Sequence, residues 1–472
     1  MSNHGRRFPA RLRALALLGV APLGIAALAL PAPARPVAAA ASPIKHIVVL
    51  YLENHSFDSI LGYWCKANPG RCPQGAMPSS VTLADGTTVT PSVEPDIVPA
   101  VNHSVASNQK ALANNWDHIT GCGQAASYAC IGGYTPAQIP NATSLASRFA
   151  INDNTFSMAD SPSWGGHLYA VMGQTDHFTG DNPIAAPGVT PGPGWGCDSN
   201  KVTTWAPSLG APTQQIPSCI PDPLLNPAQY PNGGAFEQTP ASNALTIMDR
   251  LDAAKLAWKI YGDPDPTTNG TVTPGYIWDT CPSIANCLDT SQSSHNVMSS
   301  SFTTDAQNGN LPNFSLVVPA GSTAPASEHN GTSMTVGDDW VGQVANAVMS
   351  GPEWKSTALF ITWDDCGCFY DQVKPGTNPD GTQQGPRSPL IVVSPYAKPA
   401  FTDHRHATFV SILAYVEKTF GLRPMGVNDN GAYDFSKAFN YSQKPLKPVK
   451  TVWRKWPKDA YHINQAELRQ DT

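Results

Sequence analysis

The sequence predicts an α/β fold, a three-layer α/β/α sandwich whose largely parallel central sheet is covered by helices on both faces. Short apolar runs suited to buried strands occur at residues 47–52, 314–318, 358–363 and 390–393. Apolar residues recur at helical spacing in residues 341–349 and 408–420, and Gly421 provides a natural helix stop. Strands that alternate with helices favour a parallel sheet with both faces buried.

The first predicted strand, residues 47–52, ends in a cluster of polar side chains. It is too short for a helix, and Glu53, Asn54, His55 and Ser56 follow it directly. The carboxyl ends of buried strands are where α/β folds place their sites. An ordinary polar loop, or a glycosylation sequon at Asn54, is the alternative interpretation.

A second polar cluster follows the predicted strand at residues 358–363. Asp364 and Asp365 come immediately after it. Together with Glu53 and Asn54 they offer enough oxygen atoms for a hard divalent cation. Adjacent acids also occur in plain turns, but both clusters end buried strands of one predicted sheet.

Composition and the amino-terminal segment indicate an exported protein. Charged residues make up 14% of the chain, the net charge is -6, and 45 Pro and 38 Gly indicate a loop-rich surface. No basic patch suggests nucleic-acid binding. Residues 1–41 contain arginines, then an apolar stretch, then small residues, which is the order of a secretory signal peptide. Arg6-Arg7 would also permit twin-arginine export. No later run is long enough to span a bilayer.

The ten cysteines fit an oxidising compartment, because an even count in an exported chain indicates disulfides. Local pairing is the simplest connectivity, although crossed pairs remain open. The expected pairs are Cys65 with Cys72, Cys122 with Cys130, Cys197 with Cys219, Cys281 with Cys287, and Cys366 with Cys368. Metal binding or redox chemistry is a weaker alternative for the last pair.

Two segments differ from the rest in composition. Residues 181–238 are dense in Pro, Gly and Asn and are expected to form a loop-rich surface insertion, either a pocket wall or a tolerated loop. Residues 432–472 are polar and basic and are expected to form a solvated C-terminal extension.

The chain resembles the bacterial phosphoesterase family, the group of phospholipases C and acid phosphatases. The segments that carry the resemblance occur in the family's order and reach Leu422. They are Glu53-Asn54-His55-Ser56-Phe57-Asp58, Asn102-His103-Ser104, Asn152-Asp153-Asn154, residues 161–169, residues 311–315, Glu328-His329, residues 363–371 and residues 385–396.

The resemblance implies an alkaline-phosphatase-like fold, with the catalytic domain expected over residues 42–431. It implies that a divalent metal ion is held by Glu53, Asn54, Asp364 and Asp365, and that Ser163 is the nucleophile. Histidines around the phosphate map by position onto His103, His295 and His329. Such chemistry suits these residue types, because a metal ion lowers the pKa of a serine hydroxyl and imidazoles can donate to phosphoryl oxygens or protonate the leaving alcohol.

Alternatives remain for some of these residues. Taken alone, Ser163 would be expected to cap a helix, and Ser161 is its nearest competitor as nucleophile. His295 lies in a polar loop where an exposed histidine is ordinary. The family's Asp-His is Asp371-Gln372 here, and its His-Thr-Ser-type helix start is replaced around Phe409. The corresponding imidazole is therefore missing, or is replaced by His404 or His406.

We therefore expect a secreted, metal-dependent phosphoric ester hydrolase that acts through a phosphoseryl intermediate. Its substrate would be a phosphomonoester or a phospholipid headgroup, with a slight preference for a broad phosphatase because only a short polar tail follows Leu422. A sulfatase is disfavoured because no Cys-x-Pro-x-Arg segment is present. A catalytically inactive extracellular binding protein on the same fold is the alternative from another class. The oligomeric state is not indicated.

Overall fold

The structure is a computed structural model. It describes residues 42–460 apart from 123–127, 160, 222–243, 266, 269–270, 273, 320–325 and 459. The expected signal peptide lies outside the described residues, as do part of the expected insertion and the last residues of the expected extension. Within the described part of the chain, no helix combines the length and the apolar character needed to cross a bilayer.

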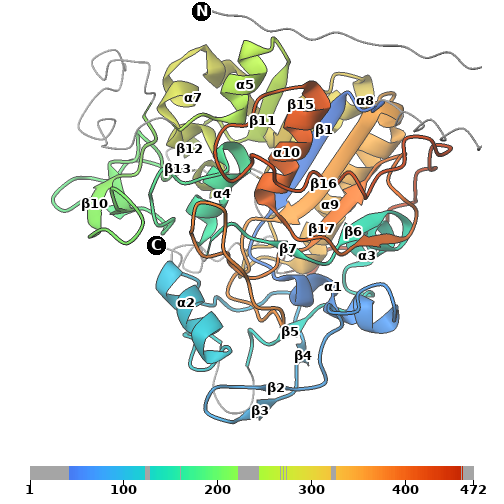
Figure 1. Cartoon of the computed structure of the whole chain (residues 1–472), viewed down its shortest axis with the longest axis horizontal. Coiled ribbons are helices and arrows are strands. Elements are labelled where there is room, and N and C mark those ends of the chain that lie inside the picture. Colours follow the sequence, from blue (N-terminus) through green and yellow to red (C-terminus); the bar gives the residue numbers. More distant parts are fainter. Residues whose placement is uncertain are drawn as a thin grey trace, which may run out of the picture. The chain divides into compact units, whose positions relative to one another are not determined.

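The central sheet has eight strands in the order β14-β11-β15-β1-β16-β17-β6-β18 (Figure 1). They are β1 (His46–Leu52), β6 (Ala150–Asn152), β11 (Trp258–Gly262), β14 (Asn296–Met298), β15 (Phe314–Val317), β16 (Thr357–Trp363), β17 (Leu390–Val393) and β18 (Phe401–Asp403). Neighbouring strands are parallel except that β17 runs antiparallel to both β16 and β6. The four strands expected from apolar runs are β1, β15, β16 and β17, so the predicted, largely parallel sheet is confirmed.

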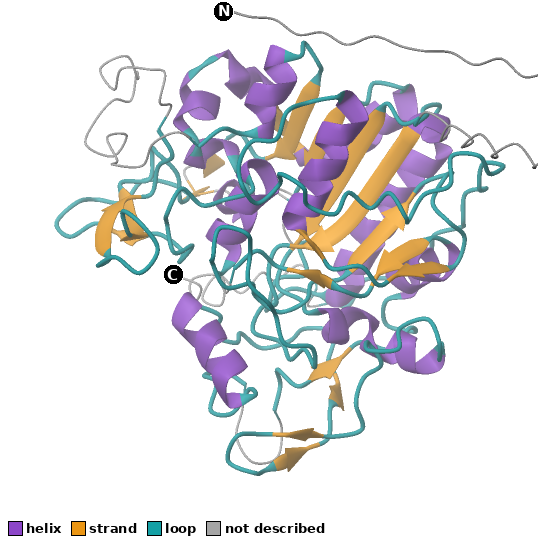
Figure 2. Cartoon of the chain, viewed as in Figure 1, coloured by secondary structure: helices purple, strands orange, loops and turns teal. Residues whose placement is uncertain are grey.

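Helices cover both faces of this sheet. The described helices are α1 (Phe57–Ala67), α2 (Val105–Asn114), α3 (Pro140–Arg148), α4 (Ser163–Met172), α5 (Ile247–Ala253), α6 (Pro274–Trp278), α7 (Ala285–Asp289), α8 (Phe302–Asn308), α9 (Met334–Ser350) and α10 (Phe409–Phe420). Helices α4 and α10 pack on one face, and α3, α8 and α9 pack on the other (Figure 1, Figure 2). Because both faces are covered, every residue of β16 is buried, which explains its continuous apolar sequence.

The two helices expected from periodicity are present as α9 and α10. Ser333 caps α9, and α10 begins with a capping box between Thr408 and Ser411. Helix α10 ends at Gly421, whose φ of 68° is left-handed and favours glycine.

Smaller elements surround the main sheet. The described part of the expected insertion contains a three-stranded antiparallel sheet of β8 (Ile184–Ala185), β9 (Lys201–Trp205) and β10 (Gln214–Pro217). Short pairs are β2 (Val81–Thr82) with β3 (Thr88–Val89), β4 (Ser92–Val93) with β5 (Gly132–Gly133), β7 (Thr155–Phe156) with β19 (Ala407–Thr408), and β12 (Thr267–Thr268) with β13 (Thr271–Val272). Short 3-10 helices are η2 (Cys281–Ser283), η3 (Ser291–His295), η4 (Ser299–Ser301) and η6 (Trp354–Ser356).

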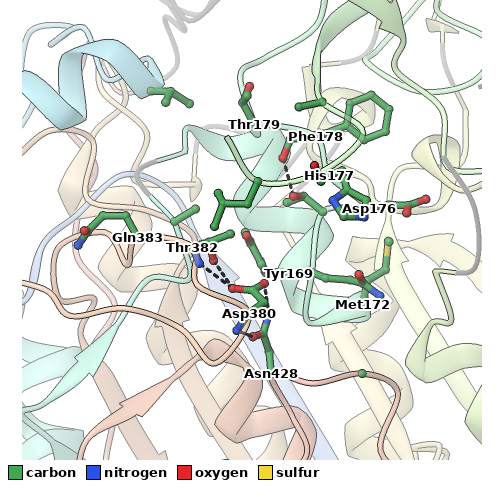
Figure 3. A pocket seen from close by; sticks show the side chains of 18 of the residues that line it. Tyr169, Met172, Asp176, His177, Phe178, Thr179, Asp380, Thr382, Gln383 and Asn428 are labelled. Carbon is green, nitrogen blue, oxygen red and sulfur yellow. Dashed lines mark hydrogen bonds between the residues drawn. The ribbon is translucent and has the colours of Figure 1, made fainter. Parts of the chain in front are cut away.

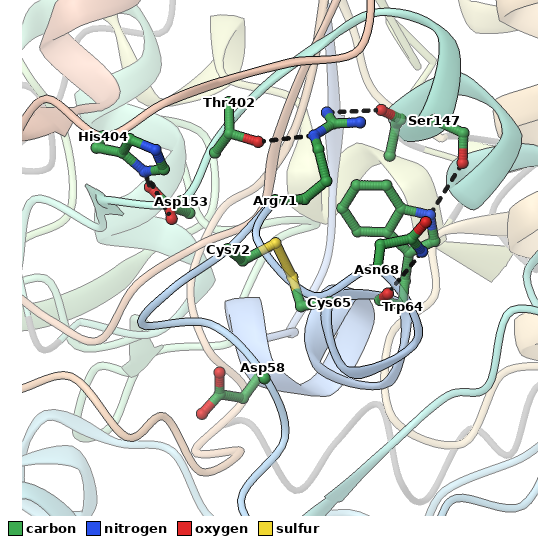
Figure 4. The surroundings of a disulfide bond; sticks show 12 residues. Asp58, Trp64, Cys65, Asn68, Arg71, Cys72, Ser147, Asp153, Thr402 and His404 are labelled. Carbon is green, nitrogen blue, oxygen red and sulfur yellow. Dashed lines mark hydrogen bonds and ion pairs between the residues drawn. A yellow bond between two sulfur atoms is a disulfide. The ribbon is translucent and has the colours of Figure 1, made fainter.

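Four of the five expected disulfides are formed, namely Cys65–Cys72, Cys122–Cys130, Cys197–Cys219 and Cys281–Cys287. Figure 4 shows the first of them beside Arg71, whose Nε donates to Thr402 Oγ1 at 3.0 Å. This disulfide therefore closes the end of α1 where the chain is held against β18. The fifth expectation is wrong: Cys366 and Cys368 are buried thiols. Their sulfur atoms lie instead against residues of α2, at Asn108 Oδ1 and the Ser107 carbonyl.

Part of the described portion of the expected extension packs against the domain. Phe435 and Phe439 are buried and contact the Phe360 ring of β16. Further along, Arg454 donates through Nε to Asp339 at 2.9 Å and through Nη2 to Asp338 at 2.9 Å, both in α9. The many lysines of this segment indicated solvent exposure, but its aromatic side chains and Arg454 attach it to the domain.

Candidate active site

The parallel register of β1 and β16 brings the two predicted polar clusters together. Leu52 pairs with Trp363, so Glu53 and Asn54 lie beside Asp364. The Asn54 N–H donates to Asp364 Oδ1 at 2.9 Å. Asn54 has a left-handed φ of 63°, a conformation that asparagine tolerates better than most residues, and the chain leaves the strand there.

All four predicted metal-binding residues are buried in this cluster, with exposed fractions of 1% or less. The Asp365 N–H donates to Asp364 Oδ1 at 2.7 Å, which fixes the turn that follows β16. Both polar clusters therefore meet at one edge of the sheet, as the strand ends predicted.

Helix α4 brings the predicted nucleophile to the cluster. Ser163 is the first residue of α4, and its Oγ donates to Glu53 Oε2 at 2.9 Å. The N-cap residue is Pro162, which provides no side-chain cap, so Ser163 does not have the capping role that was its alternative. The Tyr51 hydroxyl of β1 donates to the Gly166 carbonyl at 2.9 Å and holds the helix against the strand.

The structure adds His167 to the predicted residues. Its Nε2 lies 2.8 Å from Glu53 Oε1 and 3.8 Å from Asp364 Oδ2. Glu53, His167 and Asp364 form a cluster whose ligand atoms could hold a metal ion. His167 follows Ser163 by four residues, and this spacing on one helix face is the sequence signal that could have identified it.

Burial makes this cluster electrostatically costly. It raises the pKa of Glu53 to about 7, against the opposing influence of His329. Burial, and then the charge of Glu53, raise the pKa of Asp364 to about 7. Burial lowers the pKa of His167. Two ionised carboxylates are therefore disfavoured here unless a cation offsets their charge.

The polar atoms at the centre of the cluster fit a divalent ion. Asp364 Oδ2 and the side-chain oxygen of Asn54 are buried and have no hydrogen-bond partner among the described residues. Buried oxygens without partners are rare and call for an explanation. Carboxylate and amide oxygens are the donors that divalent cations take in proteins, so the residues suit such an ion.

His103 and His329 lie together, with ring centroids 6.3 Å apart. Each Nδ1 is 2.8 Å from a backbone carbonyl, that of Val101 and that of Asn330 respectively. A carbonyl only accepts, so each Nδ1 donates and the Nε2 of each neutral ring is an acceptor. The Glu53 N–H donates to the Ser327 carbonyl at 2.9 Å and the His329 N–H donates to Ser327 Oγ at 3.2 Å, so the histidine pair adjoins the carboxylate cluster.

The structure does not bring the third expected histidine to this cluster. His295 Nδ1 is 3.0 Å from the Trp258 carbonyl, and its ring stacks on Trp258 at 4.6 Å. Trp258 begins β11, which runs parallel to β15 and through it to β1. His295 therefore lies at the edge of the sheet opposite Glu53. His295 was matched to a family histidine only by its position along the sequence, and that position does not reveal in which direction β11 runs.

The departures from the family pattern have structural roles outside the cluster. The Gln372 side chain donates to Asp58 Oδ1 at 3.0 Å. Phe409 packs edge-on against Tyr51 at 5.6 Å. His404 pairs with Asp153, and His406 lies 3.0 Å from Gln384. These contacts do not support either histidine as a replacement for the family's imidazole.

The buried Arg387 links the segment that follows β1 to the segment that follows β16. Arg387 Nη2 donates to Asp58 at 2.9 Å and its Nε donates to Asp371 at 2.8 Å. Its guanidinium lies 4.5 Å from the ring centre of Phe57. Asp58 belongs to the segment that follows β1 and Asp371 to the segment that follows β16, so one side chain fixes both.

A cavity of about 650 Å³ lies beside α4. Tyr169 and Met172 line it from the helix, and residues 176–179, Asp380 and Asn428 line it from the surrounding loops (Figure 3). Ser163 and His167 are on the helix face that meets β1 and are not among its lining residues. The cavity is therefore distinct from the carboxylate cluster.

Comparisons with known proteins add independent information. A model of the Phosphoesterase family matches residues 44–423. Non-specific phospholipase C1 of Arabidopsis thaliana is 25% identical over 466 residues, which cover 88% of this chain and 75% of that protein. Phospholipase C A of Mycobacterium tuberculosis (strain H37Rv) is 24% identical over 465 residues, which cover 87% of this chain and 80% of that protein.

Two solved structures have low similarity to this chain. A protein in the alkaline phosphatase superfamily from Vibrio parahaemolyticus is 13% identical with a TM-score of 0.34, over 80% of this chain and 74% of that one. The phosphonate monoester hydrolase of Agrobacterium radiobacter is 10% identical with a TM-score of 0.33, over 80% and 74% of the two chains.

Replacing Gly166 with alanine should destabilise the protein by about 1 to 3 kcal/mol. The new Cβ would lie 3.0 Å from the Asp364 carbonyl oxygen, so α4 must move away from the cluster. Alanine favours helices by itself, so a loss of stability would report the clash. The control is Gly426→Ala, where the nearest atoms are 3.9 Å away. Urea unfolding followed by tryptophan fluorescence measures both; equal midpoints for the two variants would show that α4 does not depend on this close approach.

Proposed function

Because this chain belongs to the Phosphoesterase family and is a hydrolase acting on phosphoric ester bonds, we propose that it works through Ser163 and a divalent metal ion. The observation that carries the proposal is the hydrogen bond of 2.9 Å from the Ser163 hydroxyl to Glu53. A serine hydroxyl in contact with a buried set of carboxylates supports Ser163 as the nucleophile. The relatives named as phospholipases C support the reaction class but do not identify these residues.

In this proposal Glu53, Asn54, Asp364 and Asp365 hold the ion. When bound, a divalent ion lowers the pKa of a serine hydroxyl and neutralises charge on phosphoryl oxygens. Glu53 orients the Ser163 hydroxyl by accepting its hydrogen bond. The Ser163 hydroxyl then gives its proton to Glu53 while its oxygen bonds to phosphorus, and the bond from phosphorus to the alcohol oxygen breaks as that oxygen takes a proton from His329. Water later attacks the phosphoserine and gives a proton to His329, the serine oxygen recovers its proton from Glu53, and phosphate or a phosphorylated headgroup is released.

We assign His103 and His329 to the substrate's phosphoryl group and leaving group. The backbone contacts of their Nδ1 atoms fix both rings, so each presents Nε2 in a defined direction. When protonated, each ring donates from Nε2, and such preorganised donors stabilise negative charge that develops in the transition state. A protonated His329 would supply the proton that the departing alcohol needs.

The proposed substrate is a phosphate ester, either a phosphomonoester or the headgroup ester of a phospholipid. The relatives' names favour the phospholipid, because three separate ones are called phospholipases C. The proposed location is outside the cytoplasm. The order of residues 1–41 supports it, and so do the four disulfides, which form in oxidising compartments.

Ser163→Ala should lower turnover by at least about 10³-fold, because no phosphoseryl intermediate can form without the hydroxyl. Purified enzyme would be assayed with p-nitrophenyl phosphate and with p-nitrophenyl phosphorylcholine, which separates monoester from diester cleavage. The control is Ser161→Ala, a buried serine just before α4, which should retain activity. Unfolding midpoints should match for all three proteins. Near-normal turnover by Ser163→Ala would place the nucleophile elsewhere.

His329→Ala should slow hydrolysis of β-glycerophosphate about 10²-fold more than that of p-nitrophenyl phosphate, because only the first leaving group needs a proton. Steady-state rates on both substrates measure the difference. His295→Ala is a matched control that should leave both rates unchanged, since His295 lies at the opposite sheet edge. If His329→Ala harms both substrates equally, His329 binds phosphate and is not the acid.

A further inference from the structure

His167 contacts two of the carboxylates to which the proposed function assigns the metal ion. Its Nε2 is 2.8 Å from Glu53 Oε1 and 3.8 Å from Asp364 Oδ2. Ligand atoms bonded to one ion at 2.0–2.2 Å lie about 3 to 3.5 Å from each other. The two distances from His167 Nε2 lie on either side of this range, and one ligand atom from each of Glu53, His167 and Asp364 lies within 4.8 Å of the others, so a small movement would bring all three to one ion.

The fold holds the His167 ring in this position. The ring packs edge-on against Tyr51, with centroids 5.1 Å apart, and its side chain is 5% exposed. Tyr51 and Glu53 are two residues apart, so they lie on the same face of the chain, the face toward α4. The ring cannot turn toward solvent without separating α4 from β1.

His167 faces both carboxylates. Within the described residues, the ion pairs of Glu53 and Asp364 are with His167, and no lysine or arginine pairs with either carboxylate. The Nε2 atom of an imidazole is a common metal ligand, and here it lies against both carboxylates.

We propose that His167 is a nitrogen ligand of the metal ion and that this site therefore selects a transition-metal ion of the Zn²⁺ or Fe²⁺ class over Mg²⁺ and Ca²⁺. The proposal rests on the metal dependence proposed above. Oxygen donors alone suit Mg²⁺ and Ca²⁺, which take imidazole poorly. Adding one imidazole to carboxylate and amide oxygens gives the mixed donor set that Zn²⁺ and Fe²⁺ prefer.

The test measures metal binding by the full-length protein after chelation. His167→Gln should weaken Zn²⁺ binding at least about 100-fold, because even outer-shell partners of metal ligands cost 10- to 100-fold. Its Mg²⁺ affinity should be unchanged, so the Zn²⁺/Mg²⁺ preference falls. His295→Gln is the matched control and should bind both ions as the wild type does. Competition with a chromophoric chelator measures Zn²⁺, and titration calorimetry measures Mg²⁺.

A second measurement does not depend on whether the variant folds. X-ray absorption of the Zn²⁺-loaded wild type should show the outer-shell scattering of an imidazole ligand. Oxygen-only scattering, or equal Zn²⁺ affinity in the wild type and a folded His167→Gln, would overturn the proposal.

These outcomes are separate from the outcome for the proposed function. Suppose that His167→Gln loses Zn²⁺ binding but the wild type hydrolyses no phosphate ester. This result would support His167 as a ligand and refute the proposed function. Metal-dependent hydrolysis with unchanged Zn²⁺ affinity in His167→Gln would do the reverse.

Discussion

The close burial of Glu53 and Asp364 is the constraint on which the rest of the site depends. The register of β1 against β16 forces the two carboxyls together, because each follows the last paired residue of its strand. Burial raises the pKa of each to about 7, and His167 provides no compensating charge in its neutral form. Such a pair must either keep a proton or hold a cation. A cation also explains why Asp364 Oδ2 and the Asn54 side-chain oxygen lack hydrogen-bond partners within the described part of the chain.

The surrounding structure holds α4 and the segments that follow β1 and β16 close to this pair of carboxyls. Gly166 lets α4 approach the Asp364 backbone, and Tyr51 anchors the same helix, so Ser163 reaches Glu53. Arg387 joins the segments that follow β1 and β16 through buried ion pairs. Removing one partner from such a pair costs about 3 to 5 kcal/mol, so the fold resists separating the two clusters. The positions of Ser163, Glu53 and Asp364 are thus maintained by interactions that take no part in the proposed reaction.

The sequence predicted what is local and periodic. Continuous apolar runs identified β1 and β16, and the polar residues directly after them identified Glu53 and Asp364. His167 was missed because Gly165 and Gly166 hide the helical pattern of α4. His295 was misplaced because the direction of β11 is set by long-range pairing. The packing of Phe439 and the reduced state of Cys366 depend on contacts with distant segments, which composition and spacing do not encode.

Anomalous diffraction from crystals grown with a transition-metal ion would locate the ion without reference to activity. We expect one strong peak enclosed by Glu53, Asn54, Asp364 and Asp365 and next to the Ser163 hydroxyl. A structure at high metal concentration with no peak there, and with Glu53 and Asp364 sharing a proton instead, would contradict metal binding by these residues.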